Sequence, residues 1–195
     1  MLADKLKDYH IILGSVSPRR RELFAALGFA FDVADPAIDE NCPDTVPPKE
    51  TAVYLAEAKS AKLGEGLGSR QILITADTIV LCGDRLLPKP GSREEAVEFL
   101  GLLSGREHLV ITGVCLRLAG RQRSFSVETV VAFRQLDDDE IDYYVDNYSP
   151  YDKAGAYGIQ EWIGYVATER IEGSYFNVIG LPVSRLYREL NEFVK

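Results

Sequence analysis

The segment from Gly14 to Leu23, "GSVSPRRREL", places three consecutive arginines directly after a Ser-Pro step. Ser17 is a good N-cap for a helix that begins at Pro18, where the missing N–H costs nothing. The free N–H groups of a helix N-terminus and the forked side chain of arginine both suit phosphate oxygens. We therefore predict an anion site over residues 17–21. The alternative is a solvated helix face, which a single arginine would more commonly indicate.

Three other segments carry polar side chains that could act on a ligand. Asp77 lies inside the apolar run "ITADTIV", where a carboxylate is costly unless it is paired or bound to a metal. A capped turn between two strands explains Asp77 equally well. Lys89 stands between two prolines on a stiff stretch, although an exposed turn lysine is the commoner case. Gln160 ends "YDKAGAYGIQ", whose small residues allow a ligand to approach the backbone, but alone this segment indicates only a loop.

The elements that must position these side chains alternate along the chain. Strands are expected at residues 10–16, 29–33, 108–118 and 124–133, with a strand pair over 71–87. Helices are expected at 18–28, 50–67, 93–103, 137–148 and from about residue 182, with extended chain between residue 160 and the last helix. Ser92 and Glu95 form a capping box for the helix at 93–103. This pattern predicts an α/β fold with a mixed central sheet flanked by helices and two lobes around a substrate cleft, in a single domain over residues 1–195.

Composition narrows the classes of function. The chain has 195 residues and a formal net charge of −8, which argues against non-specific binding to nucleic acid. It contains no apolar run of about 18 residues and no signal-peptide core, so we expect no membrane span. Three widely spaced cysteines without a CxxC pair favour a reducing cytoplasm, and two histidines argue against a structural zinc site. There is neither a P-loop nor a dinucleotide-binding fingerprint.

Taken together, these segments resemble the Maf family of nucleotide pyrophosphatases, also called septum-formation proteins. The similarity runs over nearly the whole chain. It rests on six blocks in order: "SVSPRRRELFAALG", "TADTIV", "PKP", "SGREHLVITGV", "DKAGAYGIQ" and "IEGSYFNVIGLPVSRL". Three positions depart from the family pattern, because Gly14 stands in place of alanine and Pro88 and Glu161 stand in place of glycines.

The resemblance implies hydrolysis of nucleoside triphosphates to a monophosphate and pyrophosphate, with Mg²⁺ or Mn²⁺ as the divalent metal. "AYGIQ" is similar to the branch that acts on dTTP and UTP, whereas the branch that prefers methylated GTP has a different sequence there. The functional positions of the family fall on Ser15, Arg19, Arg20, Glu40, Lys59, Asp77, Lys89 and Gln160. Lys62 lies close to Lys59 and is the alternative for that position.

The mechanism implied is metal-assisted attack of water on the α-phosphate. Asp77 and Glu40 would bind the metal, and Asp77 would also orient the water as a base. The cations Arg19, Arg20, Lys59 and Lys89 would stabilise charge on the phosphates. Arg21, by contrast, is expected to be solvated.

Two rival functions remain open at this point. One is a house-cleaning pyrophosphatase for other nucleotides such as dITP, and the other is a nucleotide-binding regulator of cell division with little hydrolysis. The expected partner is a nucleoside triphosphate, with neither nucleic acid nor membrane. The sequence leaves open whether the chain forms a homodimer and whether it acts in division.

Overall fold

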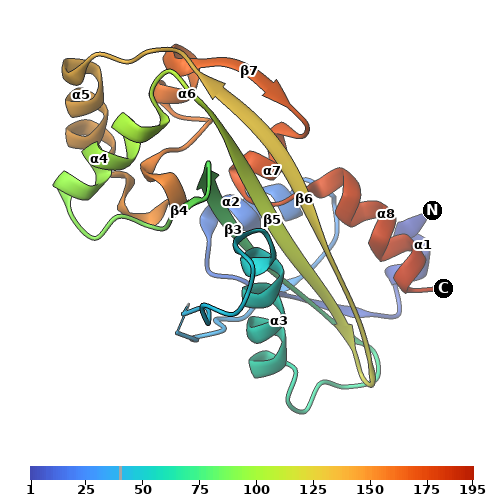
Figure 1. Ribbon diagram of the computed structural model, residues 1–195. Helices are drawn as coiled ribbons and strands as arrows, with labels where there is room; N and C mark the ends of the chain where they lie inside the picture. Colours follow the sequence, from blue (N-terminus) through green and yellow to red (C-terminus); the bar gives the residue numbers. More distant parts are fainter. Residues whose placement is uncertain (40) are drawn as a thin grey trace. The chain divides into compact units, whose positions relative to one another are not determined.

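The computed structural model describes residues 1–39 and 41–195, and its described strands form one seven-stranded sheet (Figure 1). The strand order is β2-β1-β3-β5-β6-β7, with β4 paired to β3. The strands are β1 (His10–Gly14), β2 (Asp32–Val33), β3 (Gln71–Cys82), β4 (Arg85–Leu87), β5 (Glu107–Leu118), β6 (Arg121–Phe133) and β7 (Thr168–Glu172). β1 is parallel to β2 and β3, whereas β4 and β7 are antiparallel to β3 and β6. The prediction of an α/β fold with a mixed sheet is confirmed.

Helices accompany the sheet along the whole chain. The α-helices are α1 (Leu2–Leu6), α2 (Pro18–Ala25), α3 (Thr51–Leu63), α4 (Arg93–Leu103), α5 (Asp138–Tyr148), α6 (Trp162–Ala167), α7 (Tyr175–Ile179) and α8 (Val183–Phe193). Short 3₁₀ turns are η1 (Pro48–Glu50), η2 (Pro150–Asp152) and η3 (Ala154–Ala156). Over residues 1–39 and 41–195, none of these helices has both the length and the apolar character needed to cross a bilayer.

Two of the predicted elements need correction. The helix expected over residues 50–67 ends at Leu63, because Gly64 forms its C-cap and Gly66 adopts a left-handed φ of 80°. The chain after residue 160 is extended over β7, as expected, but on either side of this strand it forms the short helices α6 and α7, which were not predicted. Helices of five or six residues depend on packing rather than on their own periodicity, so the sequence pattern does not predict them.

The capping box predicted at α4 is only half formed. The hydroxyl of Ser92 accepts a hydrogen bond from the N–H of Glu95 at 3.2 Å, as expected. The carboxylate of Glu95, however, accepts the N–H of Gly91 at 2.6 Å. The glutamate therefore binds one residue before the N-cap.

The chain divides into two compact units. Unit 1 comprises residues 1–77, 112–127 and 180–195, and unit 2 comprises residues 78–111 and 128–179. The boundaries fall within β3, β5 and β6, so each of these strands begins in one unit and continues into the other. Each unit has its own hydrophobic cluster. The substrate cleft expected between two lobes stays a prediction.

The core of unit 1 joins the two ends of the chain. α1 and α8 lie side by side near the labelled termini (Figure 1). Their buried side chains belong to one cluster, which includes Leu2, Leu6, Leu186, Leu190 and Phe193. Phe24 of α2 is fully buried in the same cluster and meets the edge of Phe31 with ring centroids 4.9 Å apart. This packing fixes α2, the helix that carries the arginines.

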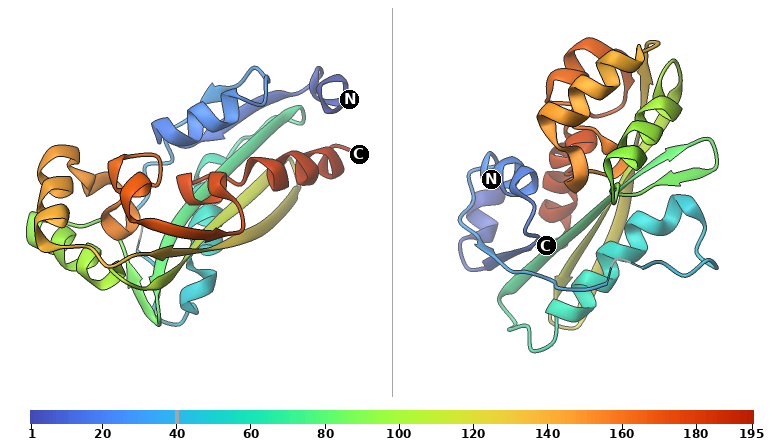
Figure 2. Two further views of the ribbon diagram at one scale, coloured as in Figure 1. Left: turned by 90° about the horizontal axis from the view of Figure 1, so that it is seen from above. Right: turned by 90° about the vertical axis from the view of Figure 1, so that its left-hand side faces the viewer.

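The core of unit 2 lies around α4 and α5, which run side by side (Figure 2). Phe99 of α4 and Tyr144 of α5 are among its fully buried side chains. His108, Phe133 and Tyr157 form an aromatic trio with ring centroids 4.9 to 5.3 Å apart. The trio anchors the start of the segment that leads to Gln160.

Candidate active site

The parallel pairing of β1 and β3 brings two of the predicted segments to one edge of the sheet. Gly14, the last residue of β1, is paired with Thr75 of β3. Beyond this level β1 ends, and the chain continues through Ser15 into α2, while β3 continues to Asp77. The carboxyl edge of parallel strands is where α/β folds commonly bind ligands. Ser15 and Asp77 therefore follow paired positions on neighbouring strands of unit 1.

The N-terminus of α2 is organised by serine and arginine side chains. The hydroxyl of Ser17 caps the helix by accepting the N–H of Arg20 at 3.5 Å. Ser15, which is buried, accepts the N–H of Ser17 at 3.3 Å and a guanidinium N–H of Arg20 at 3.5 Å. The Nε of Arg20 donates to the carbonyl of Gly180 at 2.9 Å. Arg19 and Arg20 are half-buried and Arg21 is exposed, so the structure distinguishes the three arginines as expected.

Asp77 lies within the continuous strand β3, so the reading of this residue as part of a turn is wrong. The turn comes later, after Cys82. Asp77 is only 7% exposed, and its Oδ1 accepts a hydrogen bond from the Nζ of Lys59 at 2.5 Å. Lys59 is itself only 5% exposed. The cost of burying this carboxylate is offset by a buried ion pair.

Close packing of α3 against the sheet places Lys59 beside Asp77. The hydroxyl of Thr75 donates to the carbonyl of Ala56 at 2.6 Å, which ties α3 to β3. A Cβ on Gly113 of β5 would lie 2.3 Å from the backbone of Ala52, so only glycine permits this approach. Lys62, by contrast, is exposed in the last turn of α3. Of the two lysines, it is therefore Lys59 that lies beside Asp77.

Lys89 and Gln160 belong to unit 2. The carbonyl of Pro88 accepts the N–H of Gly155 at 3.2 Å, which connects the Lys89 segment to η3. Lys89 is exposed, while Gln160 is half-buried. The Oε1 of Gln160 is buried, and no residue that the structure describes donates a hydrogen bond to it. This amide oxygen is thus ready to accept an N–H from a ligand.

The predicted metal ligand Glu40 lies outside the described residues. Across residues 1–39 and 41–195, no group of three or more histidine, cysteine or acidic side chains converges in a way that could hold a metal ion. In the described part of the predicted ligand set, Asp77 is therefore the single carboxylate.

The order of these segments matches a known family. The model of the family described as Maf-like protein matches residues 10–193. This chain belongs to the Maf family. The resemblance inferred from the six sequence blocks is confirmed.

Curated relatives of this Maf chain cover almost its entire length. It is 50% identical to a dTTP/UTP pyrophosphatase of Porphyromonas gingivalis over 98% of each chain. It is 51% identical to a dTTP/UTP pyrophosphatase of Bacteroides fragilis over 98% of this chain and 100% of the relative. A dTTP/UTP pyrophosphatase of Flavobacterium johnsoniae is 42% identical over 100% of both chains.

A solved structure gives a much weaker likeness. It is a nucleoside-triphosphatase, or dITP/XTP pyrophosphatase, from Mycobacterium abscessus. The sequences are 14% identical, and the TM-score is 0.39 over 64% of this chain and 72% of the other. A likeness at this level says nothing about the substrate.

Two departures from the Maf pattern have local explanations. A Cβ on Gly14 would lie 2.6 Å from Thr75 and 2.7 Å from Leu63, so these two neighbours favour glycine over the usual alanine. Pro88 contributes its carbonyl to Gly155, and proline retains a carbonyl although it lacks an N–H. Both substitutions are therefore compatible with the family's site.

The third departure, Glu161, is part of a buried cluster that sequence reasoning missed. Its carboxylate accepts hydrogen bonds from the Tyr144 hydroxyl and from Lys153, the latter at 3.1 Å. The signals in the sequence were the replacement of a family glycine by Glu161 and the place of Lys153 in the block "DKAGAYGIQ", but no spacing rule connected either residue to Tyr144. The cluster lies next to Gln160 in the chain.

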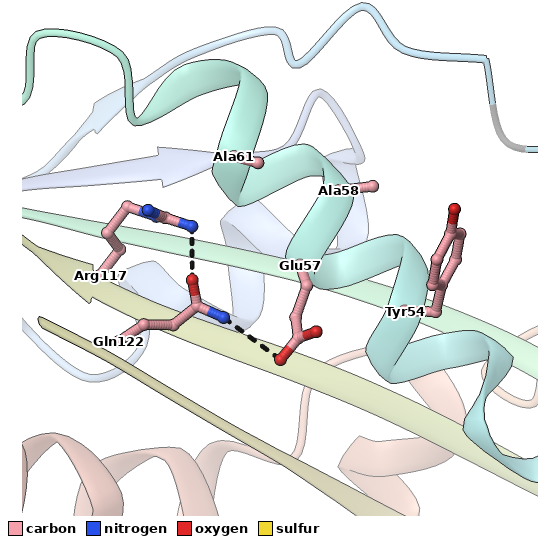
Figure 3. A pocket seen from close by; sticks show the side chains of 6 residues that line it. All are labelled: Tyr54, Glu57, Ala58, Ala61, Arg117 and Gln122. Carbon is pink, nitrogen blue, oxygen red and sulfur yellow. Dashed lines mark hydrogen bonds between the residues drawn. The ribbon is translucent and has the colours of Figure 1, made fainter.

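A separate pocket of about 340 Å³ opens along one face of α3 (Figure 3). It is lined by Tyr54, Glu57, Ala58, Ala61, Arg117 and Gln122. Figure 3 shows Gln122 between Arg117, which donates to its Oε1, and Glu57, which accepts from its Nε2 at 3.2 Å. Three of its polar side chains, Arg117, Gln122 and Glu57, are hydrogen-bonded in a chain, and the pocket contains none of the predicted site residues. We therefore assign it no part in the reaction.

Proposed function

We propose that this protein hydrolyses dTTP and UTP to the corresponding monophosphate and pyrophosphate. The buried Lys59–Asp77 pair carries the proposal, because Asp77 comes two positions after the last residue of β3 that pairs with β1, beside the point where β1 ends and leads into the arginine-bearing helix α2. A pure triphosphate binder gains little from a buried carboxylate, whereas a hydrolase can use one to orient water. The names of the relatives, which agree on dTTP and UTP, support the choice of substrate.

The phosphates would be held by the N-terminus of α2. Free helix N–H groups and the guanidinium groups of Arg19 and Arg20 favour negatively charged oxygens. Ser15 and the carbonyl of Gly180 fix the side chain of Arg20, which limits the entropy lost when phosphate binds. Lys89 is the further cation that the Maf pattern implies. These groups stabilise the charge that grows on the phosphates as the bond to pyrophosphate breaks.

Asp77 would orient the attacking water and accept its proton. Lys59 binds Oδ1 of the carboxylate and fixes its direction. Since β3 and α3 are both packed against the core, the carboxylate stands on rigid elements, as positioning of a nucleophile requires.

A divalent cation fits the donor set available. Oxygen ligands suit Mg²⁺ or Mn²⁺, and Mg²⁺ usually takes one or two carboxylates together with substrate phosphates rather than a complete protein cage. The predicted ligand set has one described carboxylate, Asp77, which agrees with this preference of Mg²⁺ for few protein ligands. Glu40 is the second ligand that the family pattern implies. Bound there, the metal would supply charge neutralisation and polarise a phosphoryl oxygen.

Gln160 would read the base. Its Oε1 accepts no hydrogen bond from the described residues, so it can accept the N3–H of thymine or uracil while the amide N–H₂ donates to a neighbouring carbonyl. Cytosine has an acceptor at N3 and would leave the buried oxygen unpaired, which costs binding energy. The free cysteines Cys42, Cys82 and Cys115 agree with the cytoplasm as the proposed location.

A nucleotide panel with product identification tests the proposal. Purified protein with Mg²⁺ or Mn²⁺ should release pyrophosphate and monophosphate from dTTP and UTP well ahead of CTP and ATP, and it should be inactive with a chelator. Gln160→Ala should reduce this preference more than it reduces activation by metal. Release of orthophosphate and diphosphate would mean attack at the γ-phosphate and would overturn the mechanism. A preference for dITP would establish the house-cleaning alternative, and tight binding without turnover the regulatory one.

A further inference from the structure

Unit 2 contains a buried polar cluster that the proposed chemistry does not use. It is built from Tyr144 of α5, Lys153 and Glu161. Tyr144 is fully buried, Lys153 is 9% exposed and the side chain of Glu161 is 21% exposed. Both carboxylate oxygens are engaged, since Tyr144 donates to Oε2 and Lys153 approaches Oε1 at 3.1 Å. Lys153 also donates to Asp152 at 2.8 Å.

Such a cluster adds little to the free energy of unfolding. Removing an ammonium and a carboxylate from water costs about as much as their attraction returns, and an apolar replacement is often as stable. Burial, reinforced by the hydrogen bond to Glu161, raises the pKa of Tyr144, so its hydroxyl remains a donor at physiological pH. The arrangement therefore fixes one geometry, and the question is which part of the molecule that geometry holds.

The backbone on both sides of Gln160 is attached to this cluster. The hydroxyl of Tyr144 accepts the N–H of Gly158 at 3.0 Å while it donates to Glu161. The N–H of Glu161 in turn donates to the carbonyl of Gly158 at 3.0 Å, which closes a turn over residues 158–161. One phenol thus holds both ends of a four-residue turn. Gln160 is inside that turn.

The turn has little room to adjust. A Cβ on Gly158 would lie 2.8 Å from Cδ of Glu161, so the glutamate side chain packs directly on the glycine. A Cβ on Gly164 would lie 1.8 Å from the carbonyl oxygen of Ile159, so α6 closes tightly behind the turn. At the start of the turn, Tyr157 is buried and its hydroxyl hydrogen-bonds to Nε2 of His108 at 2.7 Å.

We propose that Glu161, acting through Tyr144 and Lys153, is a positioning residue that holds the amide of Gln160 in the orientation needed to read the base. Glu161 makes no contact with substrate in this proposal. Its effect is to fix the turn before the base arrives, so that a wrong base cannot be accommodated by rotation of the turn. The inference rests on the proposed role of Gln160 in the recognition of thymine and uracil.

Two conservative variants test the inference. Glu161→Gln keeps the shape of the side chain but places an amide N–H₂ where Oε1 or Oε2 now accepts, and Tyr144→Phe removes the hydroxyl shared by Glu161 and Gly158. For each we expect the KM for dTTP to rise about 10-fold and the preference for dTTP over CTP to fall by a similar factor, since small misplacements of a positioning group have effects of this size. The kcat should stay within about twofold. The double variant should have a KM and a base preference no further from the wild type than the more affected single variant, because both substitutions disrupt the same cluster.

Glu140→Gln is the matched control. Glu140 is also a half-buried glutamate of unit 2, with 28% of its side chain exposed, and it is bonded to Arg134. It should lose a comparable amount of thermal stability without changing the preference between dTTP and CTP. If Glu161→Gln and Tyr144→Phe behave like this control, the cluster is merely structural and the inference is wrong.

The wild-type panel separates this result from failure of the proposed function. If the wild type prefers dTTP and UTP and the variants do too, the function stands and the positioning role falls. Binding of a non-hydrolysable α,β-imido dUTP, measured by calorimetry, repeats the comparison without turnover. Weaker binding by the two variants than by the control supports the inference even for an inactive protein. Absence of binding by the wild type overturns both proposals.

Discussion

Each unit of the molecule buries one lysine against a carboxylate, and the two pairs differ in what else they hold. Lys59 and Asp77 come from a helix and a strand, and the lysine takes one carboxylate oxygen, Oδ1. In the other pair both oxygens of Glu161 are taken, by Lys153 and by Tyr144, which also holds the backbone at Gly158. A buried ion pair is therefore not by itself a sign of catalysis. Its remaining contacts decide whether it acts on a ligand or fixes the chain.

The largest expected effect separates the two carboxylates by turnover. Asp77→Asn keeps the shape but removes the base, so the kcat for dTTP should fall about 10³-fold, as is usual when a general base is lost. Glu161→Gln should leave kcat within about twofold. Steady-state kinetics on both variants, with circular dichroism to verify folding, makes the measurement. Equal losses of kcat would erase the distinction between the pairs.

The two lysines provide the second test, because substitution of either should lower the free energy of unfolding but only substitution of Lys59 should lower kcat. Replacing Lys59 by methionine leaves the buried carboxylate of Asp77 without its ammonium, which costs about 3–5 kcal/mol of unfolding free energy. Lys153→Met should cost less, because the side chain of Glu161 is 21% exposed. We expect a large loss of kcat from Lys59→Met alone. Urea unfolding and turnover measure the two effects, and Lys62→Met, on the exposed side of α3, is the control with a change below about 0.5 kcal/mol. Loss of kcat in Lys153→Met would contradict the comparison.

The smallest expected effect concerns pH and the histidine that anchors the start of the Gln160 turn. Burial lowers the pKa of His108 from 6.5 to about 4, so the folded protein keeps the ring neutral. The unfolded chain binds a proton at higher pH than the folded chain, so stability is full above pH 6.5 and is lost as pH falls toward 4. Between pH 7 and pH 5 this histidine should remove about 2 kcal/mol.

The variant His108→Gln should lack that loss, because glutamine does not titrate. The gap in unfolding free energy between it and the wild type should therefore narrow as the pH is lowered. His10→Gln, whose ring is half exposed, should retain the pH dependence of the wild type. A constant gap between His108→Gln and the wild type from pH 7 to pH 5 would mean that the buried ring titrates normally.

The sequence predicted the part of the site that lies on regular elements. A charge inside an apolar run marked Asp77, and Ser17 before Pro18 marked the start of α2, because both are local signals. Lys59 needed the family resemblance to distinguish it from Lys62, since α3 alone gives no reason to bury one lysine rather than the other.

The cluster around Glu161 could not be predicted in this way. Its side chains come from a helix, the residue between two 3₁₀ turns and the residue before α6, and no spacing rule connects them. The helices α6 and α7 were missed for the same reason, because their stability comes from packing that is absent from their own sequences. Glu40 was predicted as a metal ligand, and that prediction still needs a direct test by metal binding to a Glu40→Gln variant.

The division of strands between the units has a consequence for synthesis on the ribosome. Domains generally fold as units while the chain emerges. Every residue of unit 2 has been made once residue 179 is translated, but the core of unit 1 needs Leu186, Leu190 and Phe193 of α8 to cover Leu2 and Leu6 of α1. Since α1 is synthesised well before α8, α1 must wait for α8 before the core of unit 1 can close. During that interval the apolar faces of α1 and β1 are the part of the nascent chain most in need of a chaperone.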